Sequence, residues 1–206
     1  MGVVMSAVVT RWWLVRHAPI VNPGNVITGQ MDLDADTGDA AALRALAAAL
    51  PPEAVWVATH LRRTRQTAAA LGTPAPLVEP DLAEQSFGAW EGLTYAALDA
   101  AHADESRRFW DAPATGRPPG GESFAEVAAR VAAAVDRLTA AHAGRDVVAV
   151  VHAGTVRAAL ALALGLDPEA ALRFQVDTLS LTRLDHVAVP GHPAGWRVVW
   201  VNRPAG

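Results

Sequence analysis

Residues 11–20 read RWWLVRHAPI, so that a short apolar run ends directly in the charged Arg16 and the titratable His17. Residues 146–154, DVVAVVHAG, repeat this arrangement with His152. Continuous short apolar runs are typical of strands that are buried on both faces of a parallel sheet. In open α/β sheets, ligands bind at the carboxyl ends of the strands. Each histidine alone could be a solvated strand end, but the repeated pattern favours two neighbouring strands whose histidines share one crevice.

Apolar runs of this type alternate along the chain with alanine-rich stretches of helical periodicity, which is the pattern of a sheet covered by helices on both faces. The sequence therefore predicts an α/β fold, a three-layer sandwich with a mostly parallel central sheet and antiparallel strands near the C-terminus. Strands are expected at residues 12–16, 54–58, 75–79, 146–152, 179–185 and 196–201. Helices are expected at residues 40–50, 62–71 and 124–143, the last opened by Ser123 and Glu126 in a capping-box arrangement.

Length and composition narrow the class of protein. A chain of 206 residues is large enough to bury a hydrophobic core, and we expect a single domain over residues 1–206. The net charge of -4 gives no electrostatic reason to expect nucleic acid or an anionic membrane as a partner. The absence of cysteine excludes disulfides and thiolate chemistry and fits a cytoplasmic protein. The sequence predicts neither a membrane span nor a secretory signal, because it has no long apolar stretch and no basic opening segment.

Residues 59–71, THLRRTRQTAAAL, place Arg62, Arg63 and Arg65 in the first turns of an expected helix, directly after an apolar run. Cations are unfavourable at the N-terminal end of a helix dipole, so an anionic partner is expected there. The alternative is that these arginines are solvated, which we expect for Arg65 and leave open for Arg62. The helix expected after His152 has free N–H groups at its start and would also favour an anion.

Six motifs occur in the order that a known family shows: LVRHA (14–18), TG (28–29), LRRTRQTA (61–68), LAEQSFGAWEG (82–92), GGES (120–123) and VVHAGTVRA (150–158). Because of these six ordered motifs, the sequence from about residue 13 to residue 166 resembles the histidine phosphatase superfamily. These are the phosphoglycerate-mutase-like proteins with an Arg-His-Gly signature. The resemblance implies that His17 is the phosphorylated nucleophile and Glu84 the proton donor. It also implies that the phosphoryl group is held by Arg16, Arg63 and His152. Contacts with the phosphoryl oxygens or the substrate would come from Asn22, Thr28, Gly29 and Ala153.

Departures from the family pattern bear on specificity. Ala18 and Ala153 stand where the first and second histidines are usually followed by glycine, and both residues are still small. Gln30 stands where many members carry arginine, which disfavours a second anionic group on that side of the pocket. The chain is also shorter than typical mutases and lacks their long insertion after the glutamate motif. The resemblance therefore indicates the phosphatase branch.

The residue types of the implied site suit phosphoryl transfer, which requires positioning and charge compensation. Guanidinium groups neutralise phosphoryl oxygens without titrating, so neither a metal nor a cofactor is expected. His17 must be neutral to attack, and a hydrogen bond from its other ring nitrogen, for example to a backbone carbonyl, would fix the tautomer. For Glu84 the alternative is a solvated loop carboxylate, because Glu91 and Glu122 are equally visible in the sequence.

Aromatic residues near the glutamate motif suggest one more part of the site. Phe87, Trp90 and Trp110 fall in segments without clear periodicity. Burial in predicted strands explains most of the other tryptophans, whereas these three side chains could line a substrate pocket.

We therefore expect a metal-independent histidine phosphatase, a phosphomonoester hydrolase that works through a covalent phosphohistidine. Its substrate would be a small phosphorylated metabolite, for example a sugar phosphate or α-ribazole phosphate. Inorganic phosphate would be product and ligand, and the sequence leaves open whether two copies form a homodimer. Two alternatives remain: a phosphoglycerate-mutase-type phosphoryl transferase, and a catalytically silent binding or regulatory member of the same fold.

Overall fold

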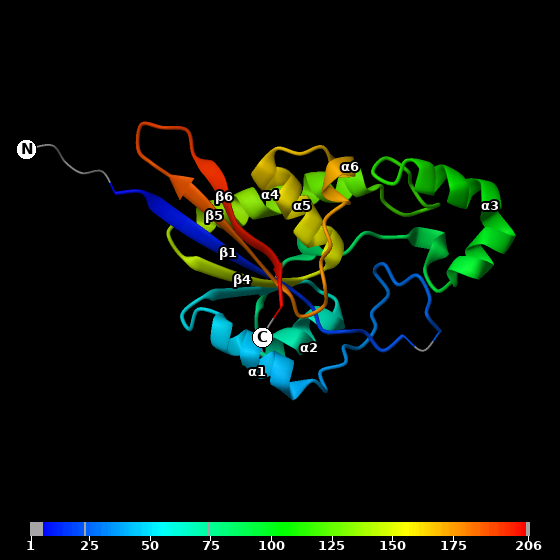
Figure 1. Ribbon diagram of the computed structural model, residues 1–206, viewed down its shortest axis with the longest axis horizontal. Helices are drawn as coiled ribbons and strands as arrows, with labels where there is room; N and C mark the ends of the chain where they lie inside the picture. Colours follow the sequence, from blue (N-terminus) through cyan, green and yellow to red (C-terminus); the bar gives the residue numbers. More distant parts are fainter. Residues whose placement is uncertain (1–5, 23, 74, 205–206) are drawn as a thin grey trace, which may run out of the picture.

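A six-stranded sheet forms the centre of the computed structural model, which describes residues 6–22, 24–73 and 75–204 (Figure 1). The strands lie in the order β3-β2-β4-β1-β5-β6. Pairing is parallel from β3 to β1, and β5 and β6 are antiparallel additions, as the sequence predicts. The strands are β1 Val8–Arg16, β2 Val55–Ala58, β3 Leu77–Val78, β4 Asp146–Val151, β5 Leu181–Ala188 and β6 Gly195–Arg203.

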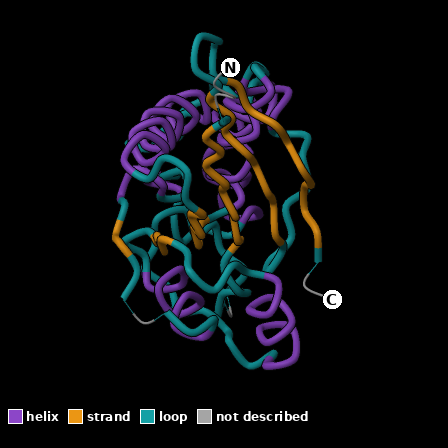
Figure 2. Tube along the Cα trace, turned by 90° about the vertical axis from the view of Figure 1, so that its left-hand side faces the viewer, coloured by secondary structure: helices purple, strands orange, loops and turns teal. Residues whose placement is uncertain are grey.

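Helices cover both faces of this sheet, which confirms the predicted α/β sandwich (Figures 1 and 2). Helices α4, α5 and α6 lie on one face and α1 and α2 on the other, whereas α3 lies beyond one end of the sheet (Figure 1). Two short 3-10 turns, η1 Pro80–Leu82 and η2 Gly88–Trp90, lie between β3 and α3. The helices are α1 Ala40–Ala49, α2 Arg62–Ala70, α3 Tyr95–Asp111, α4 Phe124–Ala141, α5 Ala153–Leu164 and α6 Pro168–Ala171.

Successive residues of β1 alternate between the two layers of the core. Trp12 and Leu14 belong to the apolar cluster of α4 and α5, whereas Val15 belongs to the cluster of α1 and α2. Burying a large apolar side chain stabilises a fold by about 1.5–3 kcal/mol. Because both faces of β4 are covered as well, Val147 to Val151 are all buried, and this explains the continuous apolar run in the sequence.

The predicted helices at residues 40–50, 62–71 and 124–143 are confirmed, and each ends one or two residues earlier than expected. The capping box of Ser123 and Glu126 is present at the start of α4. The strand expected at residues 75–79 is shorter, because only Leu77 and Val78 pair with β2.

Helix α3 was not expected, and Trp110, which the sequence places in a segment without clear periodicity, lies in this helix. The reason is that α3 buries only Leu98, Ser106 and Phe109, so its apolar periodicity is weak. It is also interrupted at His102, whose backbone angles are not helical (φ -140, ψ 41). The start of the helix does carry a local signal, since Thr94 caps it by accepting a hydrogen bond from the N–H of Ala97. Among the described residues, no helix combines the length and the apolar character that a membrane crossing requires.

Candidate active site

The two strand-end histidines lie side by side, as their shared sequence pattern predicts. Strands β1 and β4 are parallel neighbours in which Arg16 is paired with Val151, so that the next residue of each strand is a histidine. The N–H of His17 donates to the carbonyl of Val151 (3.0 Å), and the ring centroids of His17 and His152 are 5.1 Å apart. Both imidazoles therefore belong to one crevice at the carboxyl ends of the central strands.

His17 is buried, and the backbone carbonyl of the next residue holds its ring in one tautomer. Its Nδ1 lies 2.7 Å from the carbonyl oxygen of Ala18. A carbonyl oxygen only accepts, so Nδ1 carries the proton and the lone pair of the neutral ring is on Nε2. Burial, together with the positive charges of Arg63 and Arg16, lowers the pKa of His17 to about 3. The ring is therefore neutral near pH 7, with Nε2 in the form that a nucleophile needs.

His152 is completely buried, and both of its ring nitrogens bond to the protein. Its Nδ1 accepts a hydrogen bond from Nε of Arg63 (3.3 Å), so Nε2 carries the proton and donates to Oγ1 of Thr59 (3.0 Å). Burial and the neighbouring His17 and Arg63 lower the pKa of His152 well below its ordinary value. A neutral His152 thus orients the Arg63 guanidinium, and the phosphoryl contact that the resemblance implies for His152 stays a prediction.

The two buried histidines predict a specific dependence of stability on pH. Because the pKa of each ring is lower in the folded state, the unfolded chain binds more protons below about pH 6.5, and stability falls as the pH decreases towards 3. Each histidine would contribute a slope of up to about 1.4 kcal/mol per pH unit. Urea denaturation at pH 7, 6, 5 and 4 should therefore show a shallower loss of stability in His152→Gln than in the wild type. Equal slopes in the two proteins would contradict the assignment of a neutral, buried imidazole.

Arg63, which is buried, and Arg16, which is partly buried, bring positive charge to the same crevice. Arg63 is 2% exposed, and its terminal nitrogens donate to the carbonyls of Met31 and Gly29, each at 2.7 Å. With Nε bonded to His152, two of its five N–H groups remain. Arg16 donates to the carbonyl of Val176, while its buried Nε has no partner among the described residues. Since buried donors are normally paired, these groups are suited to hold an anion.

The positive charges of the arginines at the start of α2 have different surroundings. Arg62 forms ion pairs with Asp32 (3.2 Å) and Asp34 (3.0 Å), and its backbone N–H donates to Asp32 as well (2.6 Å). The expected anionic partner of this helix start is thus partly supplied by the chain itself. Arg65 is exposed, as the solvated alternative predicts. Only Arg63 turns into the crevice.

Glu84 reaches the crevice from the segment between η1 and η2. Its Oε2 accepts from the N–H of Gly154 at the start of α5 (3.3 Å), and its Oε1 accepts from the N–H of Gln85 (2.9 Å). A Cβ atom on Gly154 would lie 2.2 Å from Oε1, so only glycine allows this approach. The charge of Glu84 also raises the pKa values of Arg16 and Arg63, which burial lowers more strongly. The carboxylate is therefore close to both cations.

Two other glutamates, which only the family resemblance separated from Glu84, hold loops together. Oε1 of Glu91 accepts from the N–H groups of Gln30 and Phe87, each at 2.9 Å. A Cβ atom on Gly29 would lie 2.3 Å from the same oxygen, and Gly29 has a positive φ of 39°. Glu122 forms an ion pair with Arg130 (2.8 Å).

The four further residues of the predicted site have different surroundings. Gly29 reaches the site through its carbonyl, which accepts from Arg63, and Ala153 is the first residue of α5, directly after His152. The side-chain amide of Asn22 closes its own loop instead, by donating to the carbonyl of Val26 (2.9 Å) and accepting from its N–H (3.2 Å). The carbonyl of Thr28 accepts from Met31 (2.7 Å). Their contacts with a substrate stay predictions.

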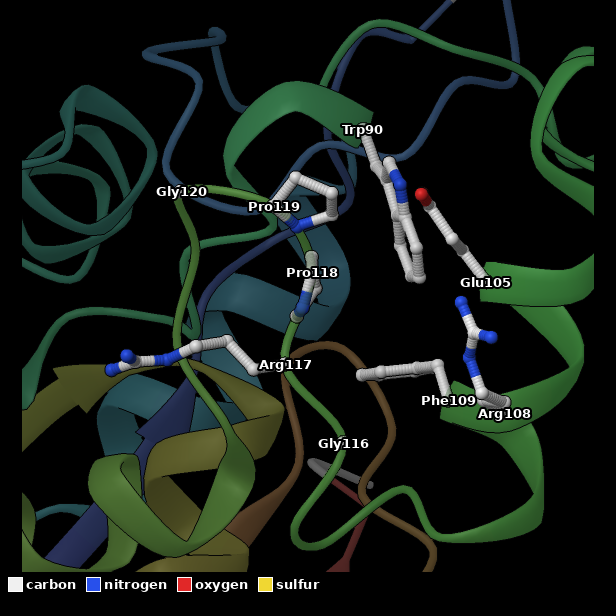
Figure 3. Close-up of a pocket in the computed structure, with 9 residues that line it drawn as sticks. All are labelled: Trp90, Glu105, Arg108, Phe109, Gly116, Arg117, Pro118, Pro119 and Gly120. Atoms are coloured by element: carbon white, nitrogen blue, oxygen red, sulfur yellow. The ribbon is translucent and has the colours of Figure 1, made fainter.

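The aromatic residues near Glu91 pack around α3. Phe109 of α3 contacts the rings of Phe87, Trp90 and Trp110, at centroid distances of 6.0, 5.2 and 5.0 Å. Trp90 and Phe109 line a cavity of about 420 Å³ beside residues 116–120 (Figure 3). Among the described residues that line this cavity there is no histidine. The cavity is therefore distinct from the crevice of His17.

The fold and the site together define the class of protein. The chain is an α/β protein whose crevice at the central strand ends combines two neutral histidines, one buried and one partly buried arginine, and a carboxylate, a combination suited to an anionic group. It belongs to the histidine phosphatase superfamily (branch 1), whose sequence model matches residues 12–203.

The named relatives include glucosyl-3-phosphoglycerate phosphatases and probable phosphoglycerate mutases. A glucosyl-3-phosphoglycerate phosphatase of Mycolicibacterium vanbaalenii is 36% identical over 173 residues, 77% of this chain and 76% of the relative. A bifunctional protein of Mycobacterium tuberculosis is 35% identical over 171 residues, 81% of this chain, but the match spans only 44% of that protein's length.

A solved structure gives the same result for the fold. A mycobacterial glucosyl-3-phosphoglycerate phosphatase has a TM-score of 0.80 and 30% sequence identity, covering 95% of this chain and 99% of its own. Its complex with VO3 has a TM-score of 0.78 and 32% identity, covering 94% of this chain and 98% of its own.

Proposed function

We propose that this protein hydrolyses phosphate monoesters of small metabolites through a covalent phosphohistidine on His17. The observation that carries the proposal is the state of His17: its Nδ1 donates to the carbonyl of Ala18, which leaves the lone pair of the neutral ring on Nε2. The Nε of Arg16, which has no partner among the described residues, and the two remaining N–H groups of Arg63 supply donors for phosphoryl oxygens.

In the first step, Nε2 of His17 attacks phosphorus and the bond from phosphorus to the ester oxygen breaks. The phosphoryl oxygens are stabilised by Arg16 and Arg63, which need not gain or lose a proton. Glu84 then donates its proton to the departing alcohol oxygen.

In the second step, water attacks phosphorus and the bond between phosphorus and Nε2 breaks. The Glu84 carboxylate takes a proton from this water, so that inorganic phosphate leaves and both His17 and Glu84 return to their starting forms. His152 keeps the Arg63 guanidinium oriented during both steps, because its Nδ1 accepts from Nε of Arg63.

The surroundings of Gln30 support hydrolysis over mutase chemistry. A mutase retains a doubly phosphorylated intermediate, which requires further cations around the pocket. Gln30 is neutral, and its side-chain amide donates to the carbonyl of Glu84 (2.8 Å). Two arginines on this side, Arg62 and Arg130, are paired with carboxylates of the chain.

The names of the relatives suggest which substrates to test first. Because proteins at 36% identity are named glucosyl-3-phosphoglycerate phosphatases, phosphate esters of sugars and of sugar-linked acids form the first panel. Purified protein should release inorganic phosphate from at least one of them, with kcat/KM well above that for p-nitrophenyl phosphate. Binding of such esters without any phosphate release would instead support a catalytically silent member of the family.

Hydrolysis is expected to continue in excess EDTA. The reason is that Arg16 and Arg63 supply fixed positive charge for the phosphoryl group. Phosphate release by protein dialysed against EDTA should be within about twofold of the untreated rate, a margin small beside the ~10²-fold or larger effects of catalytic groups. Inactivation that added magnesium or zinc reverses would contradict this part of the proposal.

A further inference from the structure

The segment that carries Glu84 has little secondary structure of its own. It connects η1, which ends at Leu82, to η2, which begins at Gly88. Backbone polar groups in such a segment need partners outside the local helix or strand pattern. Their partners decide where the Glu84 carboxylate lies.

Arg130 of α4 supplies many of these partners. Its Nη1 donates to the carbonyls of Asp81 and Ala83, each at 2.8 Å, and its Nη2 donates to the carbonyl of Glu84 (3.0 Å). Its remaining N–H groups donate to Glu122, from Nε at 2.8 Å and from Nη2 at 3.0 Å. All five N–H groups of this guanidinium are thus used, three of them on the segment that ends in Glu84.

Glu122 completes the arrangement from the other side. Its Oε2 accepts from the N–H of Ser86 (2.9 Å), and its carbonyl accepts from the side-chain amide of Gln85 (2.7 Å). Burial alone would raise the pKa of Glu122, but the hydrogen bonds from Arg130 and from Ser86 outweigh it and lower the pKa. Glu122 therefore stays ionised and holds the two residues that follow Glu84.

We propose that Arg130 and Glu122 are positioning residues for Glu84: together they fix the backbone on both sides of it, so that its carboxylate meets the departing ester oxygen. This inference rests on the proposed function, in which Glu84 is the proton donor. Neither side chain touches the substrate. Their removal should therefore resemble the loss of Glu84, because a displacement of about 1 Å can cost ~100-fold in rate.

The test compares Arg130→Gln with Arg137→Gln. Arg137 lies seven residues later on α4 and bonds the side chains of Glu79 and Asp81, so it touches neighbouring residues without bonding to Glu84. With a sugar phosphate, whose leaving group needs a proton, Arg130→Gln should lose about 10- to 100-fold in kcat/KM. With p-nitrophenyl phosphate it should lose less than about threefold, and Arg137→Gln should stay within about twofold on both substrates.

A second and a third variant make the outcome decisive. Glu122→Gln keeps the shape of the side chain and should show the same selective loss of kcat/KM. It therefore tests the proposal even if Arg130→Gln does not fold. In a Glu84→Gln background, Arg130→Gln should add no further selective loss, since the group that it positions is gone. An equal loss on the two substrates in Arg130→Gln or Glu122→Gln would overturn the positioning role.

The same measurements separate this inference from the proposed function. If the wild type hydrolyses neither substrate, the proposed function fails. If the wild type hydrolyses both and Glu84→Gln is selective while Arg130→Gln is not, only the positioning role is wrong.

Discussion

His17→Ala is expected to lower kcat/KM for a sugar phosphate by at least ~10⁴-fold, because the variant lacks the nitrogen that would form the bond to phosphorus. In the wild type, brief reaction with substrate labelled with ³²P should leave an acid-labile label on His17. Peptide mapping after rapid quenching locates this label. His152 is also neutral and buried, but its two ring nitrogens bond to Arg63 and Thr59, so no label is expected on it.

The control for this variant is His192→Ala. His192 is exposed in the turn between β5 and β6, so its loss should change neither kcat/KM nor the label. Binding of tungstate or vanadate to His17→Ala, measured by the rise in Tm, shows that Arg16 and Arg63 are still in place. Label on another residue, or full activity of His17→Ala, would rule out the covalent mechanism.

Glu84→Gln is expected to lose about 10²- to 10⁴-fold with a sugar phosphate, the usual contribution of general acid–base catalysis. With p-nitrophenyl phosphate the loss should be much smaller, because the nitrophenolate departs with little help from a proton. The amide of the variant keeps the size of the carboxyl group and removes the proton that the leaving oxygen requires.

Glu91→Gln is the matched comparison for Glu84→Gln. Glu91 accepts from the N–H groups of Gln30 and Phe87, so its loss should loosen these loops and slow both substrates alike. Measuring kcat/KM for both substrates in both variants gives the contrast directly. Equal loss on the two substrates in Glu84→Gln, with a selective loss in Glu91→Gln, would transfer the role of proton donor to Glu91.

The fold class could be predicted because its signals are local. Apolar runs such as residues 146–151 are determined by burial on both faces, and they show in the sequence whatever the neighbouring elements are. The pairing of His17 with His152 followed from the same logic, since parallel strands end at one edge of a sheet. The structure confirms that the two rings are neighbours, with centroids 5.1 Å apart, and shows the carbonyl bond that fixes the His17 tautomer.

The partners of individual polar side chains were decided only by the tertiary structure. Without the family resemblance, the residues alone could not distinguish Glu84 from Glu91 and Glu122, because their difference lies in which backbone N–H groups reach each carboxylate. Nothing in the sequence indicated a role for Arg130. Its bond to the carbonyl of Glu84 joins residues 46 positions apart.

By itself, the sequence determined the layers of this protein and the edge of the sheet at which its histidines lie, because hydrophobic periodicity and strand ends depend on the residues of one segment. The tertiary structure decided that the Gln30 side chain donates to the backbone carbonyl of Glu84 and that the Asn22 side chain closes its own loop. It also decided that the first turn of α5 donates a hydrogen bond to the Glu84 carboxylate. Each of these depends on the distance between segments that are remote in the chain. Hydrogen bonds form only within about 3.5 Å, so only the packed fold can select such partners.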